Sequence, residues 1–160
     1  MTHRSIAISA PSDFGLALCE HWLDQGHEVF GTYRTPSPAL KKLEERGARF
    51  VHCDLSDKTS VVNAIGELRR LSSDWNQLVL CPGTQDPVGP FLKTSFDEWE
   101  DSIRVNFTAQ LRIIHGLMET RNPRTPNGPL VLLFAGGGTN NATVNYSAYT
   151  LSKIALIKAC

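Results

Sequence analysis

The chain has 160 residues with 16 basic and 16 acidic side chains, so its formal net charge is zero. This length favours one domain over residues 1–160, and the balanced charge gives no basic surface for nucleic acid. No apolar run reaches the roughly 20 residues of a membrane helix, and the first residues do not show the pattern of a signal peptide, so we expect no membrane partner and a cytoplasmic location. The cysteines form no CxxC pair, which favours buried thiols and no metal site.

Short apolar runs alternate with helical patterns along the chain, which is typical of parallel βαβ units in an α/β fold. The predicted strands are 5–9, 28–33, 49–53, 78–81 and 130–135, and the predicted helices are 13–25, 37–47, 57–71, 95–123 and 146–160. The run 130–135 is continuously apolar, which indicates a parallel strand buried on both faces.

The longest predicted helix begins at a capping box formed by Ser95 and Glu98. Apolar residues recur along it at helical spacing until Pro123 ends the pattern: Trp99, Ile103, Phe107, Leu111 and Ile114.

Ligands of open parallel sheets bind at the carboxyl ends of the strands, and the first such turn runs from Ser9 to Gly15. Small residues and a helix N-terminus suit a pyrophosphate there. Only Gly15 remains of a glycine-rich turn, because Ser9 and Asp13 stand where glycines would usually lie. Asp13 is equally suited to cap the helix, and its carboxylate would repel a diphosphate.

Polar residues also follow the second and third predicted strands. Arg34 lies where an acidic residue would select a free ribose 2′-hydroxyl and a basic one can accept a 2′-phosphate. A solvated surface arginine is the alternative. Asp54 and Leu55 can hydrogen-bond an adenine amine through the Asp54 side chain or the backbone, or Asp54 can simply begin a helix.

Tyr149 and Lys153 are four residues apart on the last predicted helix, so they share one face. An ammonium beside the phenol stabilises the phenolate and makes the tyrosine a usable general acid/base near neutral pH. The pair follows an apolar strand and a glycine-rich loop, at the sheet edge where ligands bind.

With these residues the chain resembles the classical short-chain dehydrogenase/reductase family over essentially its whole length. The first turn is similar to a divergent TGxxxGxG motif, Asp54 matches the adenine-site aspartate, and Gly83 is the glycine kept from the NNAG segment. Tyr149 and Lys153 match the catalytic YxxxK pair.

Asn106 matches the family's catalytic asparagine, which supports a proton-relay water; a hydrogen-bonded amide in the middle of a helix is the alternative.

The resemblance implies a doubly wound Rossmann-type sheet with strand order 3-2-1-4-5 and helices on both faces. It also implies an NAD(P)(H)-dependent oxidoreductase, with NADP(H) preferred to NAD(H), that acts on a small carbonyl or alcohol substrate. The chain would form a homo-oligomer through the long helix from Ser95 and the last helix. The implied catalytic residues are Asn106, Tyr149 and Lys153, and the implied cofactor-binding residues are Ser9, Pro11, Ser12, Phe14, Gly15, Arg34, Asp54, Leu55, Gly83, Tyr149 and Lys153.

The chain departs from the family in two ways. Gly136 stands where the catalytic serine would lie, and Thr139 is either its replacement or an ordinary turn residue, whereas Ser147 suits the start of the last helix. The family continues beyond the YxxxK helix, so this chain would hold an incomplete domain, as either a fragment of a longer protein or a truncated form, and we expect a fragment. The alternative to an enzyme is a non-catalytic relative that senses nucleotides or serves as a dimerising scaffold.

Overall fold

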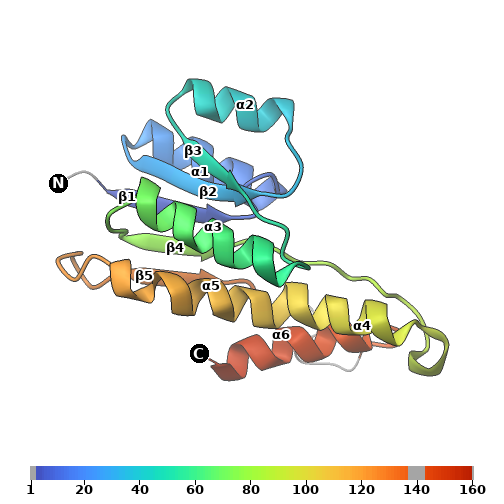
Figure 1. The fold of residues 1–160 in the computed structure, drawn as a ribbon. Coiled ribbons are helices and arrows are strands. Elements are labelled where there is room, and N and C mark those ends of the chain that lie inside the picture. The colour runs from blue at the N-terminus through green and yellow to red at the C-terminus, as the bar shows by residue number, and fades with distance from the viewer. Residues whose placement is uncertain (1–2, 137–142, 160) are drawn as a thin grey trace.

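The structure is a computed structural model that describes residues 3–136 and 143–159. A single sheet of parallel strands has the order β3-β2-β1-β4-β5 (Figure 1). The strands are β1 (Arg4–Ile8), β2 (Glu28–Tyr33), β3 (Arg49–His52), β4 (Gln77–Leu80) and β5 (Leu130–Leu133). The predicted Rossmann-type sheet and its strand order are therefore confirmed.

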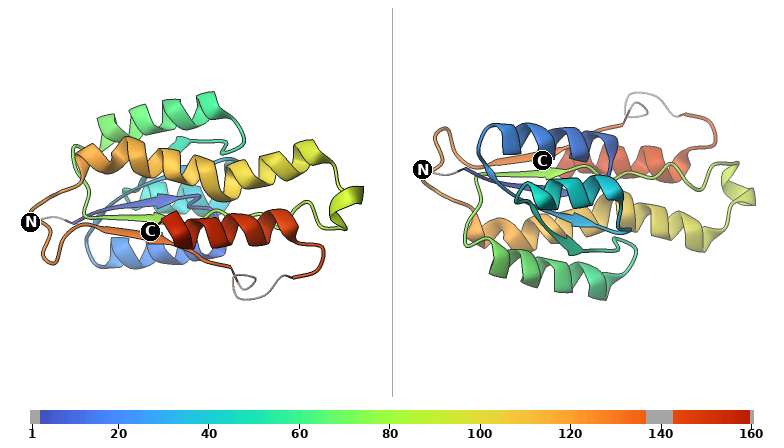
Figure 2. Two further views of the ribbon diagram at one scale, coloured as in Figure 1. Left: turned by 90° about the horizontal axis from the view of Figure 1, so that it is seen from below. Right: turned by 90° about the horizontal axis from the view of Figure 1, so that it is seen from above.

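Helices cover both faces of this sheet (Figure 2). They are α1 (Asp13–Asp24), α2 (Pro38–Glu45), α3 (Lys58–Leu71), α4 (Phe96–Ile103), α5 (Ala109–Leu117) and α6 (Ser147–Ala159). Successive residues of β1 point to opposite faces: Ile6 and Ile8 pack beneath α3 and α5, and Ala7 packs beneath α1 and α2. α6 packs beside α4. None of the described helices is long and apolar enough to cross a membrane.

Burial of β5 differs from the prediction of a strand covered on both faces. Leu130 and Leu132 are 49% and 40% exposed, whereas Val131 and Leu133 pack against the core beneath α3 and α5. β5 is an edge strand of the described sheet, and the described helices cover only one of its faces. The continuous apolar run correctly located the strand, but the predicted double burial is wrong.

The predicted helix 95–123 is not one regular α-helix. Its start is confirmed, because the Ser95 side chain accepts a hydrogen bond from the Glu98 N–H. Beyond α4 the chain forms a π-helical segment (Arg104–Thr108), then α5, and then a 3₁₀ turn (Met118–Thr120). The Nε2 atom of Gln110 donates to the carbonyl oxygens of Val105 and Asn106, at 3.2 and 3.1 Å, and so supports the wider turn.

The most buried face of this helical region does not carry the apolar residues that recur at helical spacing. The five apolar residues that set the pattern are only half-buried, whereas Ser102, Asn106 and Gln110 are almost completely buried. Four-residue spacing puts these polar side chains on one face, which packs against the segment that follows β4. The long helix thus presents polar groups to the interior near the carboxyl edge of the sheet.

Candidate functional site

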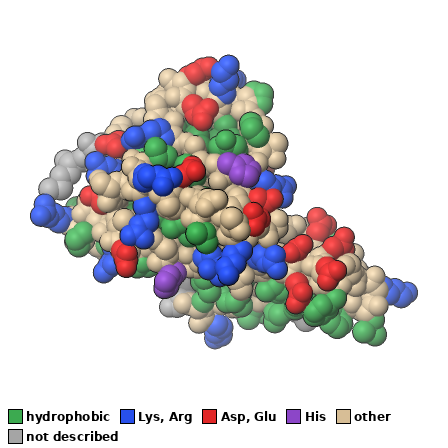
Figure 3. Space-filling model, viewed as in Figure 1, with side chains coloured by type: hydrophobic (Ala, Val, Ile, Leu, Met, Phe, Trp, Pro, Cys, Tyr) green, Lys and Arg blue, Asp and Glu red, His purple; other side chains and the backbone are tan. Residues whose placement is uncertain are grey.

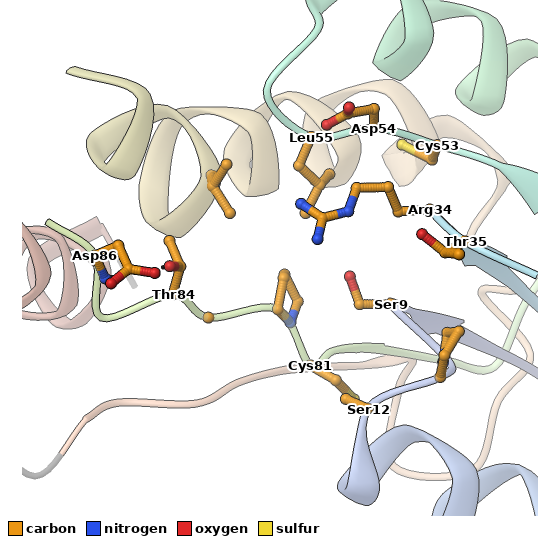
Figure 4. A pocket seen from close by; sticks show the side chains of 14 residues that line it. Ser9, Ser12, Arg34, Thr35, Cys53, Asp54, Leu55, Cys81, Thr84 and Asp86 are labelled. Carbon is orange, nitrogen blue, oxygen red and sulfur yellow. Dashed lines mark hydrogen bonds between the residues drawn. The ribbon is translucent and has the colours of Figure 1, made fainter. Parts of the chain in front are cut away.

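A cavity of about 530 Å³ lies at the carboxyl ends of β1, β2, β3 and β4 (Figure 4). Many predicted cofactor-binding residues line it: Ser9, Pro11, Ser12, Arg34, Asp54, Leu55 and Gly83. Each of them follows a strand, so the parallel sheet brings them to one edge. The cavity lies where the first turn, Arg34 and Asp54 were predicted to meet.

The first turn has a backbone suited to glycine although most of its glycines are replaced. Ser9 adopts a left-handed conformation with φ of +60°, and the Ser12 side chain accepts a 3.0 Å hydrogen bond from the Gly15 N–H. A Cβ atom on Gly15 would lie 2.6 Å from the Ala10 carbonyl oxygen, so only glycine lets α1 begin this close to the turn. The tight turn is therefore formed by one glycine, Gly15, and one serine with a left-handed backbone, Ser9.

Asp13 and Phe14 lie in the first turn of α1 but do not line the cavity. Asp13 is exposed, and Ser12 is the N-cap, so the suggested capping role of Asp13 is wrong. The Phe14 ring is 67% exposed and lies against Phe134, with ring centroids 5.2 Å apart. These two rings stand beside the first turn at the end of β5.

The guanidinium of Arg34 extends into the cavity beside Leu55 (Figure 4). Arg34 forms none of the ion pairs found among residues 3–136 and 143–159. Its charge is therefore directed at the cavity and is not used by a neighbouring carboxylate in direct contact. Arg34 is also exposed to solvent, as the alternative of a surface arginine requires, and its guanidinium suits a bound anion.

Asp54 lines the cavity but does not begin a helix, because the N-cap of α3 is Asp57. The Asp54 carboxylate accepts hydrogen bonds from the Ser56 N–H and hydroxyl, at 2.9 and 2.7 Å, in the turn before α3. Partial burial raises the pKa of Asp54, but the Ser56 hydrogen bonds and the nearby charges of Arg34 and His52 outweigh it and hold the pKa below its ordinary value. Asp54 is thus a fixed carboxylate on the cavity wall.

Asn106 is fully buried in the π-helical segment. Its Oδ1 atom accepts from the Thr84 N–H at 2.9 Å, and its Nδ2 atom donates to the Thr84 carbonyl at 2.8 Å and to the Ser102 hydroxyl at 3.1 Å. The side chain is therefore the hydrogen-bonded amide of the alternative interpretation, and it holds a segment that lines the cavity.

Lys153 is only 3% exposed and bridges the ends of two strands. Its Nζ atom donates to the Phe134 carbonyl at 2.9 Å and to the Pro82 carbonyl at 3.5 Å. Burial lowers the pKa of Lys153 from its ordinary value. The Nζ atom lies 5.8 Å from the centroid of the Tyr149 ring, so the two residues share the helix face as predicted.

Gly136, at the position expected for a serine, lies directly against Tyr149. A Cβ atom built on Gly136 would come within 2.7 Å of the Tyr149 Cζ atom and closer still to its hydroxyl oxygen. Thr139 lies outside the described residues. Ser147 begins α6, in agreement with its expected place, and its hydroxyl accepts a 3.0 Å hydrogen bond from the Trp99 indole.

Gln110 was missed by the sequence analysis. Its Nε2 atom reaches the Pro82 carbonyl at 3.4 Å, the same carbonyl that Lys153 contacts, and its buried Oε1 atom has no hydrogen-bond partner in the described chain. Asn106, Gln110 and Lys153 together hold residues 82–84 in place. The four-residue spacing from Ser102 through Asn106 to Gln110 was the available signal, because it places three polar residues on one helix face.

A second cavity of about 600 Å³ adjoins the first one. It lies between the segment after β4 and α4, and both cavities include Arg34, Thr84, Asp86 and Val105 in their walls. Arg34 therefore faces both spaces.

Comparisons with known proteins agree with this geometry. A family model described as short chain dehydrogenase matches residues 6–159. The short-chain dehydrogenase/reductase olcF of Penicillium canescens is 28% identical over 153 residues, which cover 95% of this chain and 58% of that protein. The chain thus spans less than two thirds of the length of this relative.

Solved structures share the fold. A short-chain dehydrogenase/reductase from Burkholderia vietnamiensis is 26% identical with a TM-score of 0.84, over 98% of this chain and 73% of that one. A variant of the actinorhodin polyketide ketoreductase, solved with NADPH, is 20% identical with a TM-score of 0.83, over 99% of this chain and 62% of that one. The chain belongs to the short-chain dehydrogenase/reductase family of oxidoreductases.

Proposed function

We propose that the protein containing this chain is an NADP(H)-dependent oxidoreductase that moves hydride between a nicotinamide and a small carbonyl or alcohol substrate. One observation carries the proposal: Lys153, one turn after Tyr149 on α6, lies beside the wall of the cavity that Arg34 and Asp54 line. The Nζ atom of Lys153 lies 3.8 Å from the Cβ position of Gly83, which lines that cavity.

The cavity residues fit a dinucleotide. The left-handed turn at Ser9 and the close start of α1 at Gly15 leave the positive end of a helix beside the cavity, which suits a pyrophosphate. Asp54 and Leu55 line the wall where an adenine would bind, and the cavity volume lies within the ordinary range for small-molecule sites.

Arg34 supports the preference for NADP(H). Its guanidinium points into the cavity at the end of β2, where a 2′-phosphate on the adenosine ribose would be bound by charge-assisted hydrogen bonds. The ketoreductase with the same fold was solved with NADPH, which agrees with this assignment.

The catalytic roles follow from the pair on α6. A bound nicotinamide would supply or accept the hydride. In the reductive direction the Tyr149 hydroxyl donates its proton to the substrate oxygen, and the ammonium of Lys153 stabilises the phenolate that forms. Lys153 would also hold the nicotinamide ribose hydroxyls. The role of Asn106 in ordering a relay water stays a prediction, and its contacts with Thr84 support an additional positioning role.

We further propose that the protein forms a homo-oligomer through α4, α5 and α6. Apolar side chains of these helices remain open to solvent, including Phe96 on α4 and Leu151, Ile154 and Ile157 on α6. Figure 3 shows hydrophobic side chains gathered along the lower edge of the molecule, where these helices lie. Exposed apolar surface on neighbouring helices suits a contact with a second copy.

The experiment for this proposal measures NADPH oxidation by the full-length protein with a panel of ketones and aldehydes. Tyr149→Phe removes the proton donor and should lower turnover by roughly 10²-fold or more while NADPH still binds. Tyr146→Phe, just before α6, is the matched control and should retain activity. Unaltered turnover in Tyr149→Phe would remove this residue from the mechanism, and NADPH binding without any reduction would favour the non-catalytic alternative.

A further inference from the structure

We infer that Gly136 is a positioning residue for Tyr149, because the side chain that Gly136 lacks leaves the space in which the phenol lies. The hydroxyl of Tyr149 then occupies the place of a side chain at position 136. Tyr149 therefore acts on the substrate without a second hydroxyl group from position 136. The inference rests on the proposed function of Tyr149 as proton donor and specifies how its position is set.

The contact involves the rigid part of the tyrosine side chain. A Cβ atom on Gly136 would lie 2.7 Å from the Cζ atom and 2.8 Å from the Cε1 atom of the ring, and closer still to the hydroxyl oxygen. Because the ring is rigid, these atoms can move only together, by rotation of the whole phenol. Any side chain at position 136 therefore requires the phenol or the end of β5 to move.

The backbones around this contact are tied together. Lys153, one turn after Tyr149 on α6, donates a 2.9 Å hydrogen bond to the carbonyl of Phe134, two residues before Gly136. The residues on either side of Tyr149, Ala148 and Thr150, are buried. Because α6 and the end of β5 are fixed to one another, a side chain at position 136 would be accommodated by rotating the phenol away.

This geometry reverses the effect expected from the family pattern. A serine at position 136 would restore the family's hydroxyl, and that hydroxyl alone would be expected to increase the rate. In this chain the same substitution displaces the proton donor before it can add a second hydrogen bond to the substrate. Gly136→Ser should therefore lower turnover, and Gly136→Ala, which adds only a methyl group, should lower it similarly.

The contact between position 136 and Tyr149 can be tested without an activity assay. A double-mutant cycle compares the thermal unfolding midpoints of the single and double variants. Gly136→Ala should lower the unfolding midpoint by roughly 3–10 °C in the wild-type background and by about 1 °C or less in a Tyr149→Ala background. Gly66→Ala is the matched control, because a Cβ atom on Gly66 in α3 has no neighbour within 4 Å. Equal losses for Gly136→Ala in both backgrounds, or no loss in either, would overturn the inference.

The functional arm uses the full-length protein with NADPH and a substrate that the wild type reduces. Gly136→Ser should lower kcat at least about tenfold and leave the Kd for NADPH unchanged, because position 136 acts on the proton donor and not on the cofactor pocket. A rise in kcat would overturn the inference. Absence of turnover in the wild type would refute the proposed function, whereas the unfolding cycle would still decide whether Gly136 sets the place of the phenol.

Discussion

Asn106 binds both polar backbone groups of Thr84: its Oδ1 atom accepts from the N–H at 2.9 Å, and its Nδ2 atom donates to the carbonyl at 2.8 Å. The two residues are 22 positions apart, and they join the π-helical segment to the segment after β4. Because Thr84 lines both cavities, this amide fixes a shared wall of the site.

Asn106→Ala should therefore loosen the wall of the cavity. The substitution leaves two partly buried backbone groups of Thr84 without their partner, so the free energy of unfolding should fall by about 1–3 kcal/mol. The measurements are urea unfolding and amide hydrogen exchange, in which the Thr84 N–H should exchange faster. Asn63→Ala, on the exposed face of α3, is the control and should change stability by about 0.5 kcal/mol or less. Equal stability of the two variants would show that the Thr84 contacts carry no net free energy.

The edge of the sheet that carries the site could be predicted, because it depends only on which residues directly follow each strand in the sequence. Ser9, Arg34 and Asp54 each follow a strand, and parallel strands bring such residues to one edge whatever the details of packing. The four-residue spacing indicates that Ser102, Asn106 and Gln110 share a helix face, but it does not indicate what that face contacts, because the partner of Gln110 at Pro82 lies 28 positions earlier in the chain.

Burial of β5 could not be predicted from the sequence of the strand alone. Whether Leu130 and Leu132 are covered depends on residues in other parts of the chain.

Asp13 should weaken the binding of NADPH. It is exposed in the first turn of α1, immediately after Ser12 on the cavity wall, and its charge opposes a pyrophosphate at the same helix end. Asp13→Asn should lower the Kd for NADPH several-fold, measured by nicotinamide fluorescence, and cost about 0.3–1 kcal/mol of stability.

Asp97→Asn is the matched control for Asp13, because Asp97 occupies the first turn of α4 and lines neither cavity. It should lose similar stability with no change in the Kd for NADPH. An unchanged or higher Kd in Asp13→Asn would place the pyrophosphate away from the start of α1.

Lys153 should make stability depend on pH in the alkaline range. Its pKa is lowered by burial from 10.5, so between the folded and the unfolded pKa the unfolded chain binds more protons. The destabilising effect of the buried charge is complete below the folded pKa and is relieved as pH rises through it toward 10.5. Lys153→Met removes this group, so the stability of the wild type relative to the variant should increase with pH in that window.

Urea unfolding at a series of pH values checks this dependence, with Lys158→Met on the exposed end of α6 as the control. A wild-type advantage over Lys153→Met that does not change with pH would mean that the ammonium is equally stable in the folded and unfolded chain.

Titration of the protein with NADPH and NADH, for the wild type and for Arg34→Ala, tests the assignment of the cavity most directly. The wild type should bind NADPH more tightly, and Arg34→Ala should lose roughly 10–100-fold in NADPH affinity with little change for NADH. Lys93→Ala, in the adjoining cavity, is the charge control and should leave the preference intact. Equal affinity of the folded wild type for both cofactors, unaltered in Arg34→Ala, would contradict the placement of a 2′-phosphate beside Arg34.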